Sequence, residues 1–359
     1  MSGPLVIPFF IPHQGCPHVC IFCNQRLIAR QTAKEQSFDN EAQRLSAVIH
    51  TYLQFKKNRS QVELAFFGGN FLGLETSRIL ALLKAVQPWI RQGQIHSIRC
   101  STRPDTVTQT ALDLARPFGL ETVELGVQSM DDRVLVLAQR GHTSGDTRKA
   151  LALLRENGLK TGVQVMVGLP GDDDTGAVRT AEALAELGPD LARIYPLLVL
   201  DGARLAQWYG SGQYVPLSLD QAVDQTKKMV AVFRRAGVAV ARIGLQATQM
   251  MEDAGQMIAG PWHPAFGHLV LSALMFDQAC ERIEAVLTGQ AGREGIGKPG
   301  GKKSVVLQVN PRSLSRLQGH RKANLDRLAQ RYPGLCFSIE RVETLDPDQV
   351  RAHIFGGGC

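Results

Sequence analysis

Strand-like and helix-like stretches alternate six times along the first 200 residues, and this alternation restricts the fold more than any other feature of the sequence. Short apolar runs typical of buried strands occupy residues 5–11, 62–67, 95–100, 122–127, 162–167 and 191–199. Apolar positions at helical spacing fill residues 39–57, 75–92, 106–116, 144–158 and 174–187. Strands joined through helices run parallel, with right-handed crossovers, and are covered on both faces. The fold class is therefore α/β, with either a barrel or an open doubly wound sheet.

The chain after residue 200 predicts a smaller second region. A helix is expected at 218–236, one more strand at 238–246 and a long amphipathic helix at 267–289. Residues 291–303 are rich in glycine and basic side chains, which is typical of a flexible linker. A small unit follows, with a strand at 304–309, helices around 312–318 and at 321–331, and a strand at 335–340. We expect a core at 1–246, a helical extension at 247–290, a linker at 291–303 and a basic α/β unit at 304–359.

Positive charge is concentrated near the end of the chain. The formal net charge is +7, and residues 291–359 contain 12 Lys/Arg against 6 Asp/Glu, a net +6. Such a basic unit suits a phosphate backbone, although a basic surface that serves only solubility explains the charge equally well. No apolar run reaches the roughly 18 residues that span a membrane. The first twelve residues lack a basic region and contain prolines, so they predict a strand, not a signal peptide, and we expect a cytoplasmic protein.

Three cysteines follow the first predicted strand. Cys16, Cys20 and Cys23 lie within eight residues in the pattern C-x₃-C-x₂-C. Cysteine thiolates are the usual ligands of a [4Fe–4S] cluster, and three of them leave one of its four irons open. A structural zinc site would need a fourth ligand, which His13 or His18 could supply. A disulfide is disfavoured in a reducing compartment.

The cysteine pattern resembles that of the radical S-adenosylmethionine (SAM) superfamily, and loops further along the chain resemble its Elp3-like branch. These matches are FFGGNF (66–71), STRPD (101–105), ELGVQS (124–129), RGHT (140–143), MVGLPGD (166–172), RIYPLLVL (193–200) and RIGLQ (242–246). The resemblance implies an open six-stranded (β/α)₆ partial TIM barrel with its site at the carboxyl ends of the strands. It also implies a [4Fe–4S] cluster and SAM, which is cleaved to a 5′-deoxyadenosyl radical, and an electron donor such as ferredoxin or flavodoxin.

The same resemblance implies roles for several residues outside the cysteine motif. Backbone groups at Gly68 and Gly69 would hold the amino group of SAM, although Asn70 stands where the family has an acidic residue. The resemblance assigns SAM contacts to four further residues: Phe22, Gln128, Ser129 and Gly168. Each has a structural alternative: a strand-to-helix turn for the glycines, a helix cap for the polar pair and a core position for Phe22.

Other polar residues near the predicted site have open roles. Glu124 would lie within a buried strand, where a carboxylate is costly unless it is paired, so it is either a site residue or part of a salt bridge. Arg103 and Arg193 could pair with the SAM carboxylate or with buried acids. His13, His18 and His142 lie in loops near the expected site. No residue is assigned as catalytic.

The C-terminal unit resembles a KH-type RNA-binding module. Such modules place a GXXG loop between two helices against the phosphate backbone. Here the loop would be Gly319-His320-Arg321-Lys322, which lacks the second glycine. Nothing after residue 246 resembles the acetyltransferase domain of Elongator catalytic subunits, so acetyl transfer is not expected.

The sequence therefore predicts a radical SAM enzyme that abstracts hydrogen from an RNA, with transfer RNA (tRNA) the leading substrate and the basic C-terminal unit as its contact. One alternative is a small-molecule enzyme resembling the oxygen-independent coproporphyrinogen III oxidases. The other is a zinc-stabilised RNA-binding protein without enzymatic activity.

Overall fold

A computed structural model describes residues 4–11, 15–24, 38–245, 256–289 and 303–356. The chain forms two compact units. The first unit contains residues 1–225 and 232–262, and the second contains residues 226–231 and 263–359. The expected boundary at residue 246 and all of the expected linker but residue 303 lie outside the described residues.

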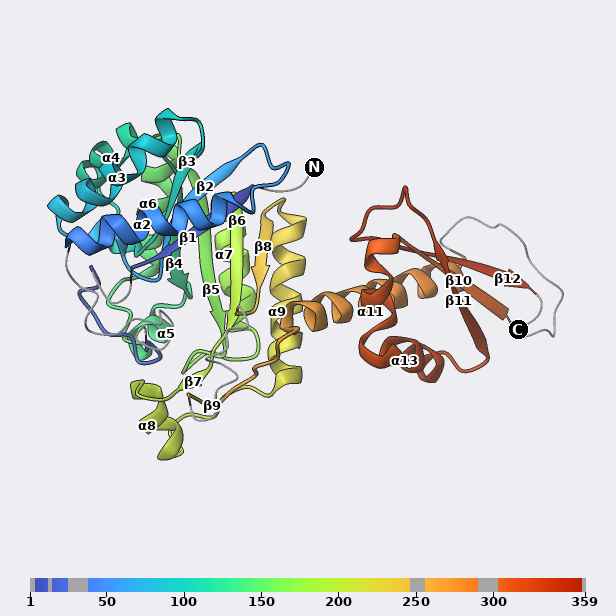
Figure 1. Ribbon diagram of the computed structural model, residues 1–359. Helices are drawn as coiled ribbons and strands as arrows, with labels where there is room; N and C mark the ends of the chain where they lie inside the picture. Colours follow the sequence, from blue (N-terminus) through green and yellow to red (C-terminus); the bar gives the residue numbers. More distant parts are fainter. Residues whose placement is uncertain (1–3, 12–14, 25–37, 246–255, 290–302, 357–359) are drawn as a thin grey trace. The chain divides into compact units, whose positions relative to one another are not determined.

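A curled parallel sheet forms the centre of the first unit (Figure 1). Its strands stand in the order β1-β2-β3-β4-β5-β6-β8, and every neighbouring pair is parallel. Their bounds are β1 Leu5–Phe10, β2 Val62–Phe67, β3 Ser97–Thr102, β4 Leu120–Gln128, β5 Lys160–Val167, β6 Leu191–Pro196 and β8 Ala239–Ile243. Because all the strands run the same way, their carboxyl ends meet at one edge of the half-barrel, where ligands bind in folds of this kind.

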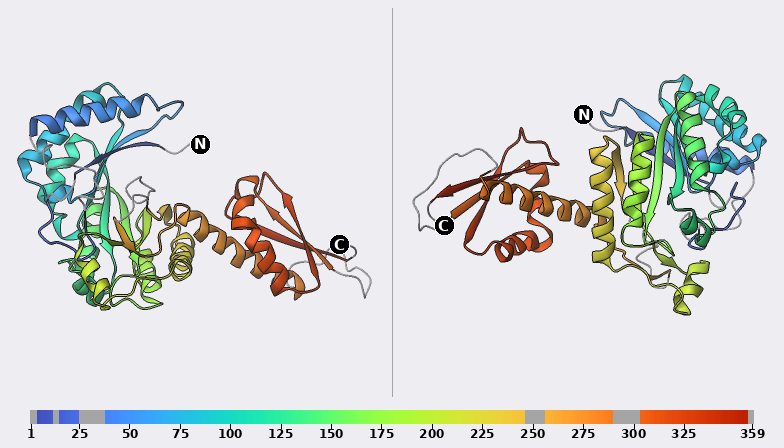
Figure 2. Two further views of the ribbon diagram at one scale, coloured as in Figure 1. Left: turned by 60° about the horizontal axis from the view of Figure 1, so that its bottom comes forward. Right: turned by 180° about the vertical axis from the view of Figure 1, so that it is seen from behind.

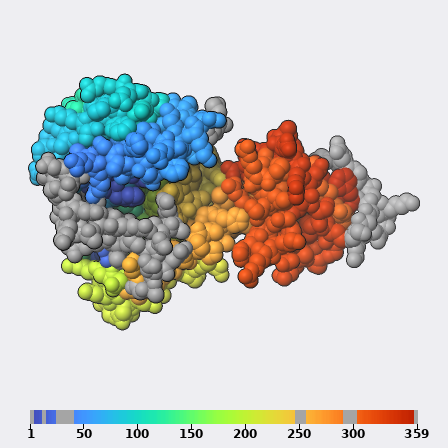
Figure 3. All heavy atoms as spheres, viewed as in Figure 1, coloured from blue at the N-terminus to red at the C-terminus, as the bar shows by residue number. Residues whose placement is uncertain are grey.

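Helices cover the convex face of this sheet (Figures 1 and 2). These helices are α2 Phe38–Leu53, α3 Thr76–Arg91, α4 Gln109–Ala115, α6 Ser144–Glu156, α7 Gly176–Leu187 and α9 Leu219–Arg235, whereas α5 Asp132–Leu137 and α8 Arg204–Gly210 lie at the carboxyl ends of the strands. Short 3₁₀ turns lie at Phe71–Gly73, Pro104–Thr106 and Arg116–Phe118. Helices α2 and α3 lie side by side and form one outer face (Figure 3).

The sequence explains why these elements form where they do. The strand residues that point outward are apolar and fully buried, for example Ile98, Val123 and Val163. Helix α6 begins at a capping box in which Thr143 and Asp146 satisfy each other's backbone N–H groups. A second capping box, between Ser218 and Gln221, begins α9.

The predicted α/β half-barrel is confirmed, with the additional strand expected at 238–246 as its seventh member. The strand expected at 191–199 ends earlier, at Pro196, because its last residues form a separate strand. This strand, β7 (Val199–Leu200), pairs antiparallel with β9 (Met257–Ala259). Helices α5 and α8 are further elements that the sequence did not predict.

The second unit packs three helices against a three-stranded sheet. Its elements are α11 Phe266–Leu287, β10 Lys303–Val309, α12 Leu314–Gln318, α13 Ala323–Arg331, β11 Leu335–Arg341 and β12 Val350–Gly356, with 3₁₀ turns at Pro311–Ser313 and His320–Lys322. Strand β10 lies between β11, which is parallel to it, and β12, which is antiparallel. A core of buried residues that includes Ile283, Leu307 and Leu328 joins the helices to the sheet.

The search for membrane-spanning helices gave a negative result for both units. Within the described ranges, every helix falls short of the length and apolar character that crossing a membrane requires.

Candidate functional site

The three motif cysteines lie in one loop, residues 15–24, which we call the cysteine loop. This loop follows β1 at the carboxyl edge of the half-barrel. Cys20 is buried, whereas Cys16 and Cys23 are partly exposed. Burial raises the pKa of the Cys16 thiol, and the positive charge of Arg103 opposes that effect. The thiols therefore lie at a partly open surface with positive charge beside them.

Ile21 anchors the middle of the cysteine loop. Its backbone N–H donates to the carbonyl of Ala138 at 3.2 Å, and its carbonyl accepts from the N–H of Leu205 at 2.8 Å. Its side chain is fully buried in an apolar cluster with residues from α5, α8 and the ends of β5 and β6. Phe22, for which the resemblance implies a SAM contact, is partly buried and packs against this cluster.

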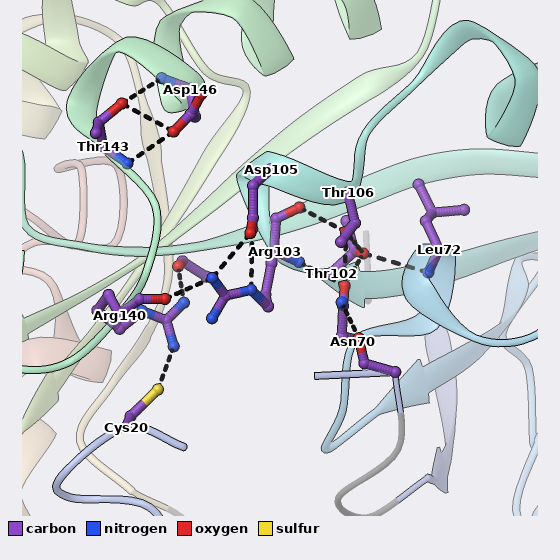
Figure 4. A network of polar contacts seen from close by, with 12 residues as sticks. Cys20, Asn70, Leu72, Thr102, Arg103, Asp105, Thr106, Arg140, Thr143 and Asp146 are labelled. Atoms are coloured by element: carbon purple, nitrogen blue, oxygen red, sulfur yellow. Dashed lines mark hydrogen bonds and ion pairs between the residues drawn. The ribbon is translucent and has the colours of Figure 1, made fainter. Parts of the chain in front are cut away.

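Arg140 connects the cysteine loop to the end of strand β4 (Figure 4). Its Nη1 donates to the sulfur of Cys20 at 3.1 Å, and its Nη2 donates to the carbonyl of Gly126. The carbonyl of Arg140 in turn accepts a hydrogen bond from Nη2 of Arg103. Arg103 is held by Asp105 through two contacts of 2.9 Å. Two guanidinium groups therefore lie at the thiols, and a nearby carboxylate balances one of them.

Unsatisfied donors at these arginines show what the site can bind. Nη1 of Arg103 and Nε of Arg140 are buried, and neither has a hydrogen-bond partner in the described part of the chain. A buried donor without a partner costs free energy, so these groups suit a ligand with acceptor oxygens. Three thiols for iron and guanidinium donors for a carboxylate fit a [4Fe–4S] cluster that carries SAM.

The thiols of the described cysteine loop do not form a site for a single metal ion, and a [4Fe–4S] cluster does not require one. Within the described ranges, no three His, Cys, Asp or Glu side chains converge closely enough to hold one metal ion. In a [4Fe–4S] cube each cysteine binds its own iron, so the three thiolates need not meet at a point. The zinc alternative depends on His13, which lies outside the described residues, or on His18, whose ring lies against Gly141.

Gln128 lies beside Arg140 at the carboxyl end of β4. It has a left-handed backbone, with φ +70°, and the register with β5 shifts there as in a β-bulge. A Cβ placed on Gly126 would lie 3.1 Å from Nε2 of Gln128 and 3.2 Å from Nη2 of Arg140. Gly126 therefore leaves space that both side chains occupy. Bulges re-aim side chains next to functional sites, and Gln128 fits that description.

The side chain of Ser129 contacts the turn after β4 and helix α7. Its hydroxyl accepts from the N–H of Asp131 at 3.1 Å and lies 3.4 Å from the hydroxyl of Thr180 on α7. These are contacts that hold the turn between β4 and α5. The helix cap expected as the alternative role is provided by Asp131, whose side chain accepts from the N–H of Arg133, and the SAM contact of Ser129 stays a prediction.

The predicted glycines occupy tight turns at the carboxyl ends of their strands. Gly68 has φ +86°, and a Cβ there would lie 3.0 Å from the ring of Phe10. Gly69 follows it in the same turn. Gly168, with φ +84°, packs against Leu217, and its carbonyl accepts from the hydroxyl of Tyr214 at 2.7 Å. The glycines allow these turns; their SAM contacts remain predictions.

Glu124 lies at the centre of an ion-pair network inside the half-barrel. Its carboxylate is fully buried and contacts Arg99 at 2.8 Å and Arg193 at 2.6 Å. Burial alone would raise the pKa of Glu124, but the charge and hydrogen bonds of Arg193 and Arg99 outweigh it and hold the pKa below its ordinary value. Arg193 therefore pairs with a buried acid, which is one of the two expectations, whereas Arg103 pairs with the exposed Asp105 and keeps one buried donor without a partner in the described part of the chain.

His142 is the buried histidine of the RGHT motif. Burial, together with the positive charges of Arg140 and Arg103, lowers the pKa of His142 to about 4. The imidazole is consequently uncharged at neutral pH. An uncharged ring beside two arginines avoids adding a third positive charge at the cysteine loop.

Sequence reasoning missed Arg140 and Asn70 as individual residues. Arg140 enters the sequence analysis only within the motif RGHT (140–143). No role is assigned there to the side chain of Asn70. The carboxamide of Asn70 contacts both the cysteine loop and β3. Asn70 lies in the turn that follows the predicted strand 62–67, and that position is a sequence signal for it; Arg140 follows α5 and has no such signal.

Comparisons with known proteins agree with this geometry. The sequence model of the radical SAM superfamily matches residues 10–184, and that of the radical SAM C-terminal domain matches residues 189–275. The tRNA uridine(34) acetyltransferase of Dehalococcoides mccartyi is 28% identical over 249 residues, covering 60% of this chain and 53% of that protein. The enzyme of the same name from Methanocaldococcus jannaschii is 28% identical over 259 residues, covering 62% and 48%.

A solved structure shows the same fold. Archaeal Elp3 of Methanocaldococcus infernus, with an N-terminal deletion, matches with a TM-score of 0.62 at 21% identity. The match covers 86% of this chain and 71% of that one. The chain spans about half the length of the curated relatives described above.

Proposed function

This chain belongs to the radical SAM superfamily of enzymes, which use a [4Fe–4S] cluster and SAM, and on that premise we propose that it modifies RNA, with tRNA as the substrate. The observation that carries the choice of substrate is the similarity of the core to proteins named for modifying uridine 34 of tRNA. The basic C-terminal unit supports it.

We assign the cluster to Cys16, Cys20 and Cys23, because their loop is anchored at the carboxyl edge of the sheet. When bound, the cluster supplies the electron that cleaves SAM. Arg140 and Gln128 lie together at Gly126, and Arg140 also contacts Cys20, so these two side chains would bind and orient the polar end of SAM. The apolar cluster around Ile21 excludes water from the inner side of the loop.

Replacing Arg140 by lysine tests this assignment. Arg140→Lys keeps the positive charge but loses the planar fork of donors, so we expect the Kd for SAM to rise at least about tenfold. Equilibrium dialysis with the reconstituted protein measures it, and iron content should stay at the wild-type value. Arg133→Lys is the control, because that side chain is 83% exposed on α5. An unchanged Kd would contradict the assignment.

The second unit presents a basic turn between two helices. Residues 319–322 join α12 to α13, and the flanking strands β10 and β11 are parallel. Gly319 is required there, since a Cβ would lie 2.9 Å from the backbone of Asn324. Arg321 and Lys322 are exposed and adopt left-handed backbone conformations, with φ +50° and +66°. Lys322 thus has the conformation that the second glycine of a GXXG loop would supply.

Replacing Lys322 by glycine removes the charge of this turn but keeps its backbone conformation. Glycine adopts positive φ without strain, so Lys322→Gly should change the free energy of unfolding by no more than about 1 kcal/mol. If Lys322 contacts phosphate, tRNA affinity falls and the slope of log K against log salt decreases by about 0.9. Fluorescence anisotropy with labelled tRNA measures both. Arg312→Gln, before α12, is the control. An unchanged salt dependence for Lys322→Gly would show that Lys322 does not contact the RNA.

An assay for 5′-deoxyadenosine tests the proposed function as a whole. The protein is reconstituted with iron and sulfide without oxygen, then given dithionite, SAM and either bulk tRNA or coproporphyrinogen III. Formation of 5′-deoxyadenosine that tRNA stimulates supports the proposal. Stimulation by coproporphyrinogen alone would favour a small-molecule enzyme. A colourless, zinc-containing protein that forms no product would contradict radical chemistry altogether.

A further inference from the structure

Asn70 lies where three segments of the first unit meet. Its side chain is fully buried, directly after the turn that ends β2. Its Nδ2 donates to the carbonyl of Gly15 at 2.5 Å, at the start of the cysteine loop. Its Oδ1 accepts from the hydroxyl of Thr102 at 2.6 Å and from the N–H of Arg103 at 3.0 Å, at the end of β3 (Figure 4). One carboxamide therefore joins the cysteine loop to the sheet.

Two glycines leave the space that this carboxamide fills. A Cβ on Gly73 would lie 2.2 Å from Nδ2 of Asn70 and 2.6 Å from the carbonyl oxygen of Gly15. Gly15 has φ +76°, and a Cβ there would lie 2.4 Å from the backbone oxygen of Asn70. Neither position can accept a side chain without moving the contact. The slot is thus shaped around Asn70 from both sides.

The chemistry of the contact requires a carboxamide. The Nδ2 atom must donate to the carbonyl of Gly15, and the Oδ1 atom must accept from Thr102 and Arg103. A carboxylate has the same shape but only accepts hydrogen bonds when ionised. It would face the carbonyl oxygen of Gly15 with no hydrogen between them.

We propose that Asn70 is a positioning residue that fastens the cysteine loop to the end of β3 and thereby determines how long the cluster is retained. Gly15 directly precedes Cys16, so a shift of this carbonyl moves the first thiolate. Asn70 acts through the loop, since its polar atoms are engaged by protein groups. This inference rests on the proposed cluster at Cys16, Cys20 and Cys23.

Asn70→Asp tests the proposal with an isosteric change. Losing one buried hydrogen bond and facing two oxygens against each other should shorten the half-time of iron loss to a chelator about tenfold or more. Hydrogen exchange on the iron-free protein gives a second readout that needs no cofactor. Amides of residues 15–24 should exchange faster in the variant, while those of β4 and α6 should not change.

Asn324→Asp is the matched control. Asn324 is also buried, and its Nδ2 donates to Ser272 and to the carbonyl of Arg316, but it lies in the second unit. This variant should weaken the second unit and leave iron retention unchanged. Gly73→Ala is a second test, because its methyl group displaces the same contact without altering residue 70; it should shorten the half-time in the same direction.

The outcomes separate the inference from the function on which it rests. A wild-type protein that takes up no iron would overturn the proposed cluster, whatever the variants do. A wild-type protein that holds iron, with an Asn70→Asp variant that holds it equally long, would overturn the role of Asn70. Faster exchange throughout β2, β3 and β4 would also overturn it, because it would show general loosening of the sheet.

Discussion

Cys20→Ala is expected to leave the protein without a stable cluster and to lower 5′-deoxyadenosine formation by at least about 100-fold, because two cysteines cannot hold a [4Fe–4S] cube. Cys20 is the buried cysteine of the three, and its sulfur accepts from Arg140. Iron and sulfide analysis after reconstitution measures the loss directly, and chromatography of the assay mixture measures the product.

A second cysteine provides the control for this experiment. Cys100 is fully buried in β3, and burial raises the pKa of its thiol well above the ordinary value. Such a thiol stays protonated and behaves as a small apolar side chain. Cys100→Ala should therefore keep its iron and its activity. Equal iron content in the Cys20 and Cys100 variants would contradict the proposed ligand set.

Glu124→Gln is expected to lower the free energy of unfolding of the first unit by about 3 kcal/mol, because it leaves two arginines in a buried network without their shared counter-charge. Arg99 and Arg193 both contact this carboxylate, and their side chains are only 10% and 11% exposed. All three tryptophans, Trp89, Trp208 and Trp262, belong to the first unit, so urea unfolding followed by tryptophan fluorescence reports on this unit alone.

An exposed ion pair in the same unit is the control for Glu124. Arg133 is 83% exposed where it pairs with Asp131, and Arg133→Gln should lower the free energy of unfolding far less than Glu124→Gln, because an exposed ion pair is screened by solvent. The pKa of Glu124 is lower in the folded state, so its stabilising contribution is present above the unfolded pKa and is lost as pH falls through the folded one. The difference between wild type and variant should thus be constant from about pH 6 to pH 8. If Glu124→Gln and Arg133→Gln lowered the free energy of unfolding equally, the buried network would contribute no more to stability than an exposed ion pair.

The sequence predicted the sheet well because parallel strands are buried on both faces. Apolar runs such as 62–67 stand out from their surroundings, and β2 has those bounds. Strand β3 extends two residues beyond its expected end, through Ser101 and Thr102, since polar residues at the carboxyl edge face the site and interrupt the apolar pattern. Helices α5 and α8 were missed because each is a short additional helix in a connection where the longer helix, α6 or α9, already accounts for the alternation of strands and helices.

The sequence predicts the parts of the candidate site that lie in one local motif. It does not predict the parts that depend on contacts between distant segments. The spacing of Cys16, Cys20 and Cys23 is visible in the sequence. The contact between Cys20 and Arg140 joins residues 120 positions apart and exists only because β4 ends beside the cysteine loop. The donor and acceptor roles of Asn70 likewise depend on two segments that the sequence does not place together.

The anchoring of Ile21 has a consequence for how the protein gains and loses its metal. Ile21 is fixed by two backbone hydrogen bonds and a buried side chain, all supplied by protein groups. Much of the entropy of ordering the loop is therefore lost when the chain folds, and not when iron arrives. Small metal-dependent domains, by contrast, are unfolded without their metal. In this protein, oxidative loss of the cluster should leave a folded and refillable apoprotein, so damage by oxygen is repaired by reassembly of the cluster and does not require a new chain.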